Sequence, residues 1–217
     1  LSCEVANNLS ICYMESGKYN KALDLQNKLY GVYLEMKDAP INYATDILQN
    51  KGNVYLYQEN YKDACTCFEQ AFKDERNPIS RGLILENLMY AKSMRDKNYA
   101  EGILLLRERI LNGDGDDETK KMLAELYYAS GDYERCGEEC VKILQQIVFG
   151  NNMLGYILVD ILRISALFML CKLNYIQKIK CMCKIEYYKM FVIRHAGLDS
   201  PYYKRIVEVN NLLNEQV

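Results

Sequence analysis

The chain has 217 residues, half of them hydrophobic and 26% charged, and its 27 Lys and Arg residues nearly balance 29 Asp and Glu residues. Such a chain can bury a sizeable core, and a net charge of −2 gives no general field that attracts a phosphate backbone, so we expect no direct nucleic-acid binding. Nine cysteines without the spacing of a disulfide scaffold, and first residues without a signal-peptide pattern, favour a reduced, cytoplasmic protein.

The first 36 residues predict a helical hairpin. Gly17 is expected to end the first helix, because glycine readily adopts the left-handed conformation that closes a helix. The second helix is expected to start at Lys18 and Tyr19 and to run to about Met36, where residues 37–40 break it. Because Leu1 already lies within a helical pattern, we expect this chain to be a segment of a longer protein.

Residues 41–73 show the same alternation of large and small residues more clearly, as suits two antiparallel helices packed on each other. The positions concerned are Leu48, Gly52, Tyr55, Tyr61, Ala64, Phe68 and Ala71. Their order resembles the tetratricopeptide repeat, whose 34-residue unit reads W-x2-L-G-x2-Y, then A-x3-F, then P. Gly52, Tyr55, Ala64 and Phe68 match that unit, whereas Leu48 stands at the Trp position, Lys51 at the Leu position, and Pro78 lies two positions late.

The pattern recurs along the chain, first in the hairpin already described, through Ala6, Leu9, Tyr13, Gly17, Tyr19 and Ala22. A weaker copy contains Asn87, Leu88, Tyr90, Ala91, Tyr99, Gly102 and Leu106, and a clearer one contains Leu123, Ala124, Tyr127, Gly131, Tyr133, Cys136 and Cys140. Between these two copies, Asn112–Glu118 is an acidic turn. It lacks the Gly and the final Glu of an EF-hand loop, so we interpret it as a helix end followed by a helix start.

Residues 153–172 are the most apolar stretch and are long enough to span a bilayer. Asp160 and Arg163 lie three apart near its middle, and each would cost about 2.5–3.5 kcal/mol on insertion. We therefore expect no membrane association. The stretch is instead expected to be a buried helix, covered by the helices from Tyr175 onward or by a second copy of the chain in a homodimer.

The resemblance implies an all-α fold, a right-handed α-α superhelix of tetratricopeptide-type hairpins with ten or eleven helices and no sheet. We predict a single repeat domain over residues 1–217. Its units are expected at about 2–36, 41–74, 82–111 and 117–148, followed by a degenerate unit at 153–195 and a capping helix at 200–216.

Catalytic patterns are scarce. His195 is the single histidine, so neither a two-histidine metal site nor a choice of catalytic triads exists, and no glycine-rich phosphate loop occurs. Cys136 and Cys140 share a helix face, but they stand at the two packing positions of the repeat. We expect neither an enzyme nor a cofactor or metal.

The resemblance also implies that the first helix of each unit lines an inner groove. Its positions hold Asn7, Gln49, Asn53, Asn87, Arg95, Lys121, Glu125 and Arg163 in this sequence. A carboxamide both donates and accepts, so a row of them can hold a peptide backbone of any sequence, and Lys121 and Arg163 would receive a carboxylate. The alternative is that these polar side chains are merely solvated.

Two classes of function follow. Repeat domains with Asn-lined grooves resemble the C-terminal domains of bacterial peptide-pheromone receptors, which implies a peptide-binding, ligand-sensing part of a larger transcriptional regulator. The alternative is a generic scaffold or self-association domain, which binds a folded partner protein or itself through the apolar C-terminal third.

Overall fold

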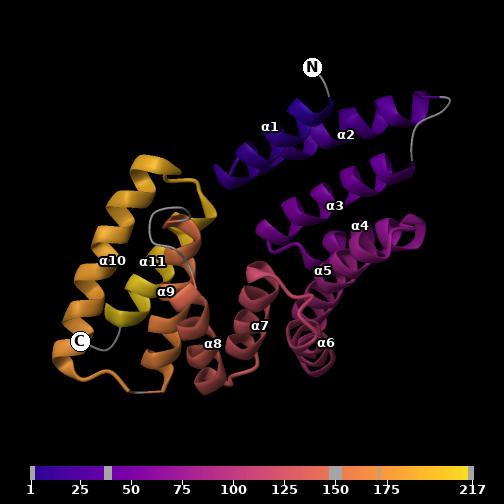
Figure 1. The fold of residues 1–217 in the computed structure, drawn as a ribbon. Coiled ribbons are helices and arrows are strands. Elements are labelled where there is room, and N and C mark those ends of the chain that lie inside the picture. The colour runs from indigo at the N-terminus through magenta and orange to yellow at the C-terminus, as the bar shows by residue number, and fades with distance from the viewer. Residues whose placement is uncertain (1–2, 37–40, 147–152, 171, 215–217) are drawn as a thin grey trace. The chain divides into compact units, whose positions relative to one another are not determined.

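The computed structural model describes residues 3–36, 41–146, 153–170 and 172–214. These residues form eleven helices and no strand, which confirms the all-α prediction (Figure 1). The predicted break at residues 37–40 lies outside them. The helices are α1 (Cys3–Glu15), α2 (Tyr19–Glu35), α3 (Ile41–Tyr57), α4 (Tyr61–Asp74), α5 (Pro78–Asp96), α6 (Ala100–Leu111), α7 (Asp117–Ala129), α8 (Tyr133–Gln146), α9 (Met153–Met169), α10 (Tyr175–His195) and α11 (Pro201–Asn214).

The chain divides into two compact units, Leu1–Asn98 with α1 to α5 and Tyr99–Val217 with α6 to α11. We call them unit 1 and unit 2 and describe each by itself. The repeat boundaries, the superhelical arrangement of the hairpins and the single domain stay predictions.

The core of unit 1 explains the order of large and small residues in its second hairpin. Leu48 of α3, Phe68 of α4 and Leu88 of α5 belong to one buried cluster, so α3 and α5 both pack against α4. A Cβ atom added to Gly52 would lie 2.5 Å from Cε1 of the Phe68 ring, which is fully buried. A side chain at position 52 would therefore separate α3 from α4.

Local sequence sets the helix ends. Gly17 and Gly131 have φ angles of 71° and 83°. Gly17 follows the end of α1, as predicted, and Gly131 follows the end of α7. Pro78 is the first residue of α5, ahead of the predicted start of the third unit at about residue 82. Asn77 caps this helix, because its Oδ1 accepts hydrogen bonds from the backbone N–H groups of Ile79 (2.9 Å) and Ser80 (3.3 Å).

The acidic turn at Asn112–Glu118 joins two helices, in line with its interpretation from the sequence. Gly113 has a φ angle of 80° just beyond the end of α6. Asp116 caps α7 through a bond of 2.8 Å from the backbone N–H of Thr119, and the hydroxyl of Thr119 accepts from the backbone N–H of Asp116.

The core of unit 2 lies between α9, α10 and α11. Ile157, Ile161 and Ile164 of α9 form one buried cluster, with its remaining members on the two later helices: Ile185, Tyr188, Val192, Tyr202, Ile206, Val209 and Leu213. Of the two covers predicted for the apolar stretch, the first, by the helices from Tyr175 onward, is therefore confirmed. Within the described ranges, no helix combines the length and apolarity needed to cross a bilayer.

Candidate functional site

Three predicted groove residues, Gln49 and Asn53 on α3 and Asn87 on α5, are half-buried side chains of unit 1. We call them the unit 1 carboxamides. Among the residues that the structure describes, no hydrogen bond to their side-chain amides is found. Asn7 differs, because its Oδ1 accepts a hydrogen bond of 3.2 Å from Nε2 of the buried Gln26. Asn7 thus helps to join α1 to α2.

Arg95 is exposed near the end of α5 and is paired with its neighbour. Its Nε and Nη2 donate to the two carboxylate oxygens of Asp96 at 2.7 and 2.8 Å. These bonds raise the pKa of Arg95 and lower that of Asp96. Because the pair is compact and exposed, Arg95 offers little net charge to a ligand.

Lys121 and Glu125 lie one turn apart on α7 in unit 2, and both are half-buried. The Lys121 ammonium lies 2.6 Å from a carboxylate oxygen of Glu118. Lys121 thus forms an ion pair within α7. The contact of Lys121 with a peptide stays a prediction.

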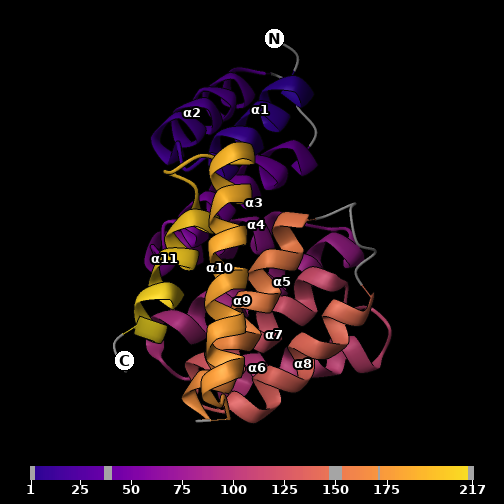
Figure 2. The ribbon, with the colours of Figure 1, turned by 90° about the vertical axis from the view of Figure 1, so that its left-hand side faces the viewer.

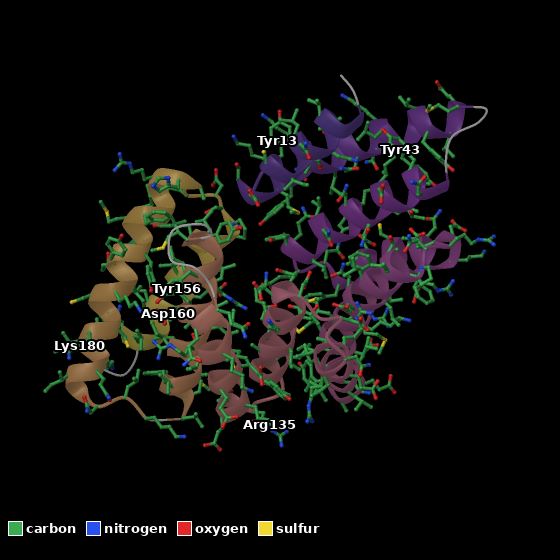
Figure 3. All side chains as sticks on the ribbon, viewed as in Figure 1. Tyr13, Tyr43, Arg135, Tyr156, Asp160 and Lys180 are labelled. Carbon is green, nitrogen blue, oxygen red and sulfur yellow. The ribbon has the colours of Figure 1, made fainter. Side chains whose placement is uncertain are left out.

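Arg163 belongs to a buried charge cluster centred on Asp160, a residue only 1% exposed (Figure 3). Its Nε and Nη2 donate to one carboxylate oxygen of Asp160 at 2.9 and 2.8 Å. The other oxygen lies 2.7 Å from the Lys184 ammonium and accepts a hydrogen bond of 2.7 Å from the Tyr188 hydroxyl. One carboxylate therefore contacts two cations and a phenol. We call these four residues the Asp160 cluster. Its two cations and one carboxylate give it a net charge of one positive unit.

The pKa shifts in the Asp160 cluster follow from its geometry. Burial raises the pKa of Asp160. Hydrogen bonds from Lys184 and Tyr188 and the charge of Arg163 have the opposite and larger combined effect, so the pKa of Asp160 lies below its ordinary value. Burial and the bond to Asp160 raise the pKa of Tyr188. Burial lowers the pKa of Arg163, but the adjacent carboxylate has a larger, opposite effect, so this pKa lies above its ordinary value. Asp160 stays ionised and Arg163 stays charged at neutral pH.

A cavity of about 480 Å³ lies beside this cluster, between the first three turns of α8 and the second half of α9. We call it the α8–α9 cavity. Most of the surface that lines it is apolar, although half of the lining residues are charged. Arg163 is the lining residue that also belongs to the Asp160 cluster. The lining residues are Tyr133, Glu134, Gly137, Glu138, Val141, Lys142, Arg163, Leu167, Leu170 and Lys172.

The residues considered for catalysis or metal binding have structural contacts. The rings of His195 and Phe191 lie 4.2 Å apart at the end of α10. Cys136 and Cys140 are fully buried, and both the bond between their side chains and burial raise the pKa of Cys140, which disfavours the reactive thiolate. In the part of the chain that the structure describes, no group of three His, Cys, Asp or Glu residues is placed to hold a metal.

Sequence reasoning found two members of the Asp160 cluster and missed the other two. The spacing of three residues put Asp160 and Arg163 on one helix face, although their ion pair was not predicted. Lys184 and Tyr188 lie on α10, more than twenty residues away, and no local pattern marks them as partners of α9.

No model of a protein family matches this chain, and no curated protein matches it either. The resemblance to the tetratricopeptide repeat therefore rests on the residues quoted from the sequence.

Proposed function

We propose that unit 1 binds an extended peptide through its backbone, with the unit 1 carboxamides as the pairing groups. One observation carries this proposal. Gln49, Asn53 and Asn87 are half-buried, yet their amides have no partner among the described residues, whereas the half-buried Asn7 has one. None of their amide atoms is buried from solvent, so these hydrogen-bonding groups are open to a ligand as well as to water.

The placement of Gln49 and Asn53 supports a common surface for these two residues. Gln49 and Asn53 are four residues apart, so they lie on one face of α3. Asn87 lies on α5, which packs against α4 as α3 does. A peptide group offers an N–H and a C=O together, which is the pair that one carboxamide can satisfy. Recognition of this kind reads the peptide backbone and tolerates many side chains.

The proposed biological context follows from the resemblance stated for the sequence. A module that binds peptides by their backbone suits the ligand-sensing part of a larger bacterial regulator, and we propose this role for the chain in the cytoplasm. The regulator role rests on the resemblance to peptide-pheromone receptors.

A binding experiment tests the proposal. A peptide is selected from a random library on the wild-type chain, and its Kd is measured by calorimetry for the wild type, for the double variant Asn53→Ala/Asn87→Ala and for Asn27→Ala. Each lost amide pair is expected to weaken binding by about 1–3 kcal/mol, whereas thermal unfolding stays nearly unchanged. Asn27 is the control, because it is an exposed Asn of α2 in the same unit. Equal affinities for wild type and double variant would refute the proposal, as would an equal loss in Asn27→Ala.

A second candidate function is supported by the outer face of α10. This helix has two apolar faces, one buried in the core of unit 2 and one exposed, and Figure 2 shows the helix in the foreground of that unit. Ile176 and Met190 are 65% and 69% exposed. The exposed residues follow a spacing of three and four, which is the spacing of a seam for a second helix. They are Ile176, Ile179, Cys183, Tyr187, Met190 and Ile193.

The charges of α10 indicate the kind of helix that fits this seam. The helix carries one acidic residue, Glu186, against five basic ones: Lys178, Lys180, Lys184, Lys189 and Arg194. A second copy of the chain would bring two basic helices together. At a lipid surface, Glu186 would lie in the middle of the inserted face. An amphipathic helix of a partner protein with acidic flanks complements the five basic residues, so we propose such a helix as the occupant of the seam.

The test uses a designed helical peptide with Leu at the seam positions and Glu beside them. We expect the chain to bind it more tightly than a peptide with Lys in place of Glu, and more weakly as salt rises. Ile176→Ser and Met190→Ser are expected to abolish the binding. Leu104→Ser is the control, because Leu104 is 59% exposed on α6, away from the seam. Equal binding of the two peptides would refute the charge argument, and unchanged binding by the seam variants would refute the seam.

A further inference from the structure

The α8–α9 cavity is built for an apolar group. Its volume of about 480 Å³ is within the usual range of small-molecule sites, and its walls carry Val141 of α8 and Leu167 of α9, followed by Leu170. Val141 is 42% exposed, so the apolar wall is in contact with water when nothing is bound. An apolar ligand would remove this surface from water.

The polar side of the cavity favours an anion. The Nε and Nη2 of Arg163 bind Asp160, but its Nη1 donates no hydrogen bond to any residue that the structure describes. Because Asp160 also serves Lys184, its single negative charge does not neutralise both cations. The Arg163 guanidinium lines the cavity, and its side chain is only 26% exposed.

The other charges of the lining balance this excess in number, so the position of each charge matters more than the sum. Lys172 pairs with Glu134 at 3.2 Å, so these two charges cancel. Lys142 pairs at 2.7 Å with Glu139, a residue outside the lining, and this leaves Glu138 as an exposed carboxylate of the lining. The ten lining residues include three cations and two carboxylates, and Arg163 is the cation held against the buried cluster.

We propose that the α8–α9 cavity binds a carboxylate that carries an apolar group. The carboxylate accepts a charge-assisted hydrogen bond from Nη1 of Arg163, and the apolar group lies against Val141, Leu167 and Leu170. Two sources offer this chemistry, a free alkanoate and the C-terminus of a peptide that ends in an apolar residue. The site lies wholly within unit 2, so it does not depend on the unit 1 carboxamides.

The first experiment titrates the whole chain with octanoate by calorimetry. We expect one molecule bound per chain, and binding about fourfold weaker for each methylene removed, as hexanoate and heptanoate would show. Octanol has the same tail without the charge and is expected to bind at least about tenfold more weakly, because a hydrogen bond between charged groups is lost.

Two variants locate the site. Arg163→Gln removes the cation and is expected to weaken octanoate binding at least about tenfold. Because Arg163 also contacts the buried Asp160, Val141→Glu provides a second variant on an exposed position, where the new carboxylate repels the ligand or occupies Arg163 itself. Leu104→Glu is the control, since it adds the same charge to unit 2 at an exposed residue of α6. The control is expected to bind octanoate as the wild type does.

A second arm separates the two sources. A short peptide that ends in leucine is compared as the free acid and as the C-terminal amide. If the acid binds and octanoate does not, the natural ligand is a peptide terminus; if octanoate alone binds, it is a free alkanoate. The proposal is overturned if neither binds, if octanol binds as tightly as octanoate, or if Val141→Glu leaves the binding unchanged.

Discussion

Replacement of Asp160 by Asn tests the energetic role of the buried charge cluster. The variant keeps the shape of the side chain and removes its charge, so Arg163 and Lys184 lose the anion that they share. Breaking a buried ion pair by removing one partner costs about 3–5 kcal/mol. The side chain of Lys184 is 40% exposed and can regain water, so we expect a loss at the lower end, about 3 kcal/mol of unfolding free energy.

The pH dependence of this loss has a defined sign. The pKa of Asp160 in the folded chain lies below its ordinary value, which the unfolded chain restores. A carboxylate of this kind contributes its full stabilisation above the unfolded pKa, and the contribution disappears as pH falls through the folded pKa. The difference in stability between wild type and Asp160→Asn is therefore constant from neutral pH down to about pH 5, and it shrinks only in more acidic solution.

Urea unfolding followed by far-ultraviolet circular dichroism measures this difference, since the chain has no Trp whose fluorescence could report it. Asp114→Asn is the control, because Asp114 is exposed in the turn before α7, and its effect is expected to stay within about 0.5 kcal/mol. The reasoning fails if Asp160→Asn costs less than about 1 kcal/mol at pH 7, or if the difference between the two chains has already vanished at pH 5.

Two further predictions concern packing and the cluster's phenol. Gly52→Ala is expected to lose about 1–3 kcal/mol of unfolding free energy, because its Cβ meets the Phe68 ring. Gly31→Ala on the open face of α2 is the control and is expected to gain about 0.5–1 kcal/mol. Equal effects of the two variants in chemical denaturation would contradict this account. Tyr188→Phe removes one hydrogen bond to a charged group, so we expect a loss of about 1.5–3 kcal/mol of unfolding free energy, measured by urea unfolding. We also expect a higher pKa of Asp160, measured by NMR titration. An unchanged pKa would show that the hydroxyl does not stabilise the carboxylate.

Most of the secondary structure was predictable because it is set by residues close together in the chain. Gly17 and Gly131 end helices through their own backbone conformations, and Asp116 starts one through a bond to a residue three positions on. The cover of α9 was also predictable, since a helix that is apolar nearly all round must be buried on more than one side. These inferences need only the local pattern and the rule that apolar surface is removed from water.

The candidate sites depend on contacts between helices, which a pattern along one helix does not predict. Gln49 and Asn53 were predicted as groove residues from their positions alone. The pairing of Asn7 with Gln26 depends on how α1 and α2 pack and could not be inferred from the position of Asn7. The α8–α9 cavity likewise requires two helix faces to leave space between them. Space between helices is set by side-chain volumes across a contact, and a periodic pattern along one helix does not contain that information.

The two apolar faces of α10 show where periodicity ceases to be informative. When apolar residues occur on opposite sides of one helix, the single direction that an amphipathic pattern normally indicates disappears, and the sequence does not tell which face is inside. Packing decides it: Ile185, Tyr188 and Val192 are buried against α9 and α11, and Tyr188 also carries the hydroxyl that Asp160 requires. The face with Ile176 and Met190 is exposed because the opposite face carries both the core residues and the Tyr188 hydroxyl. The hydrogen bond to the buried carboxylate thus favours the same rotation of α10 as the burial of apolar surface does.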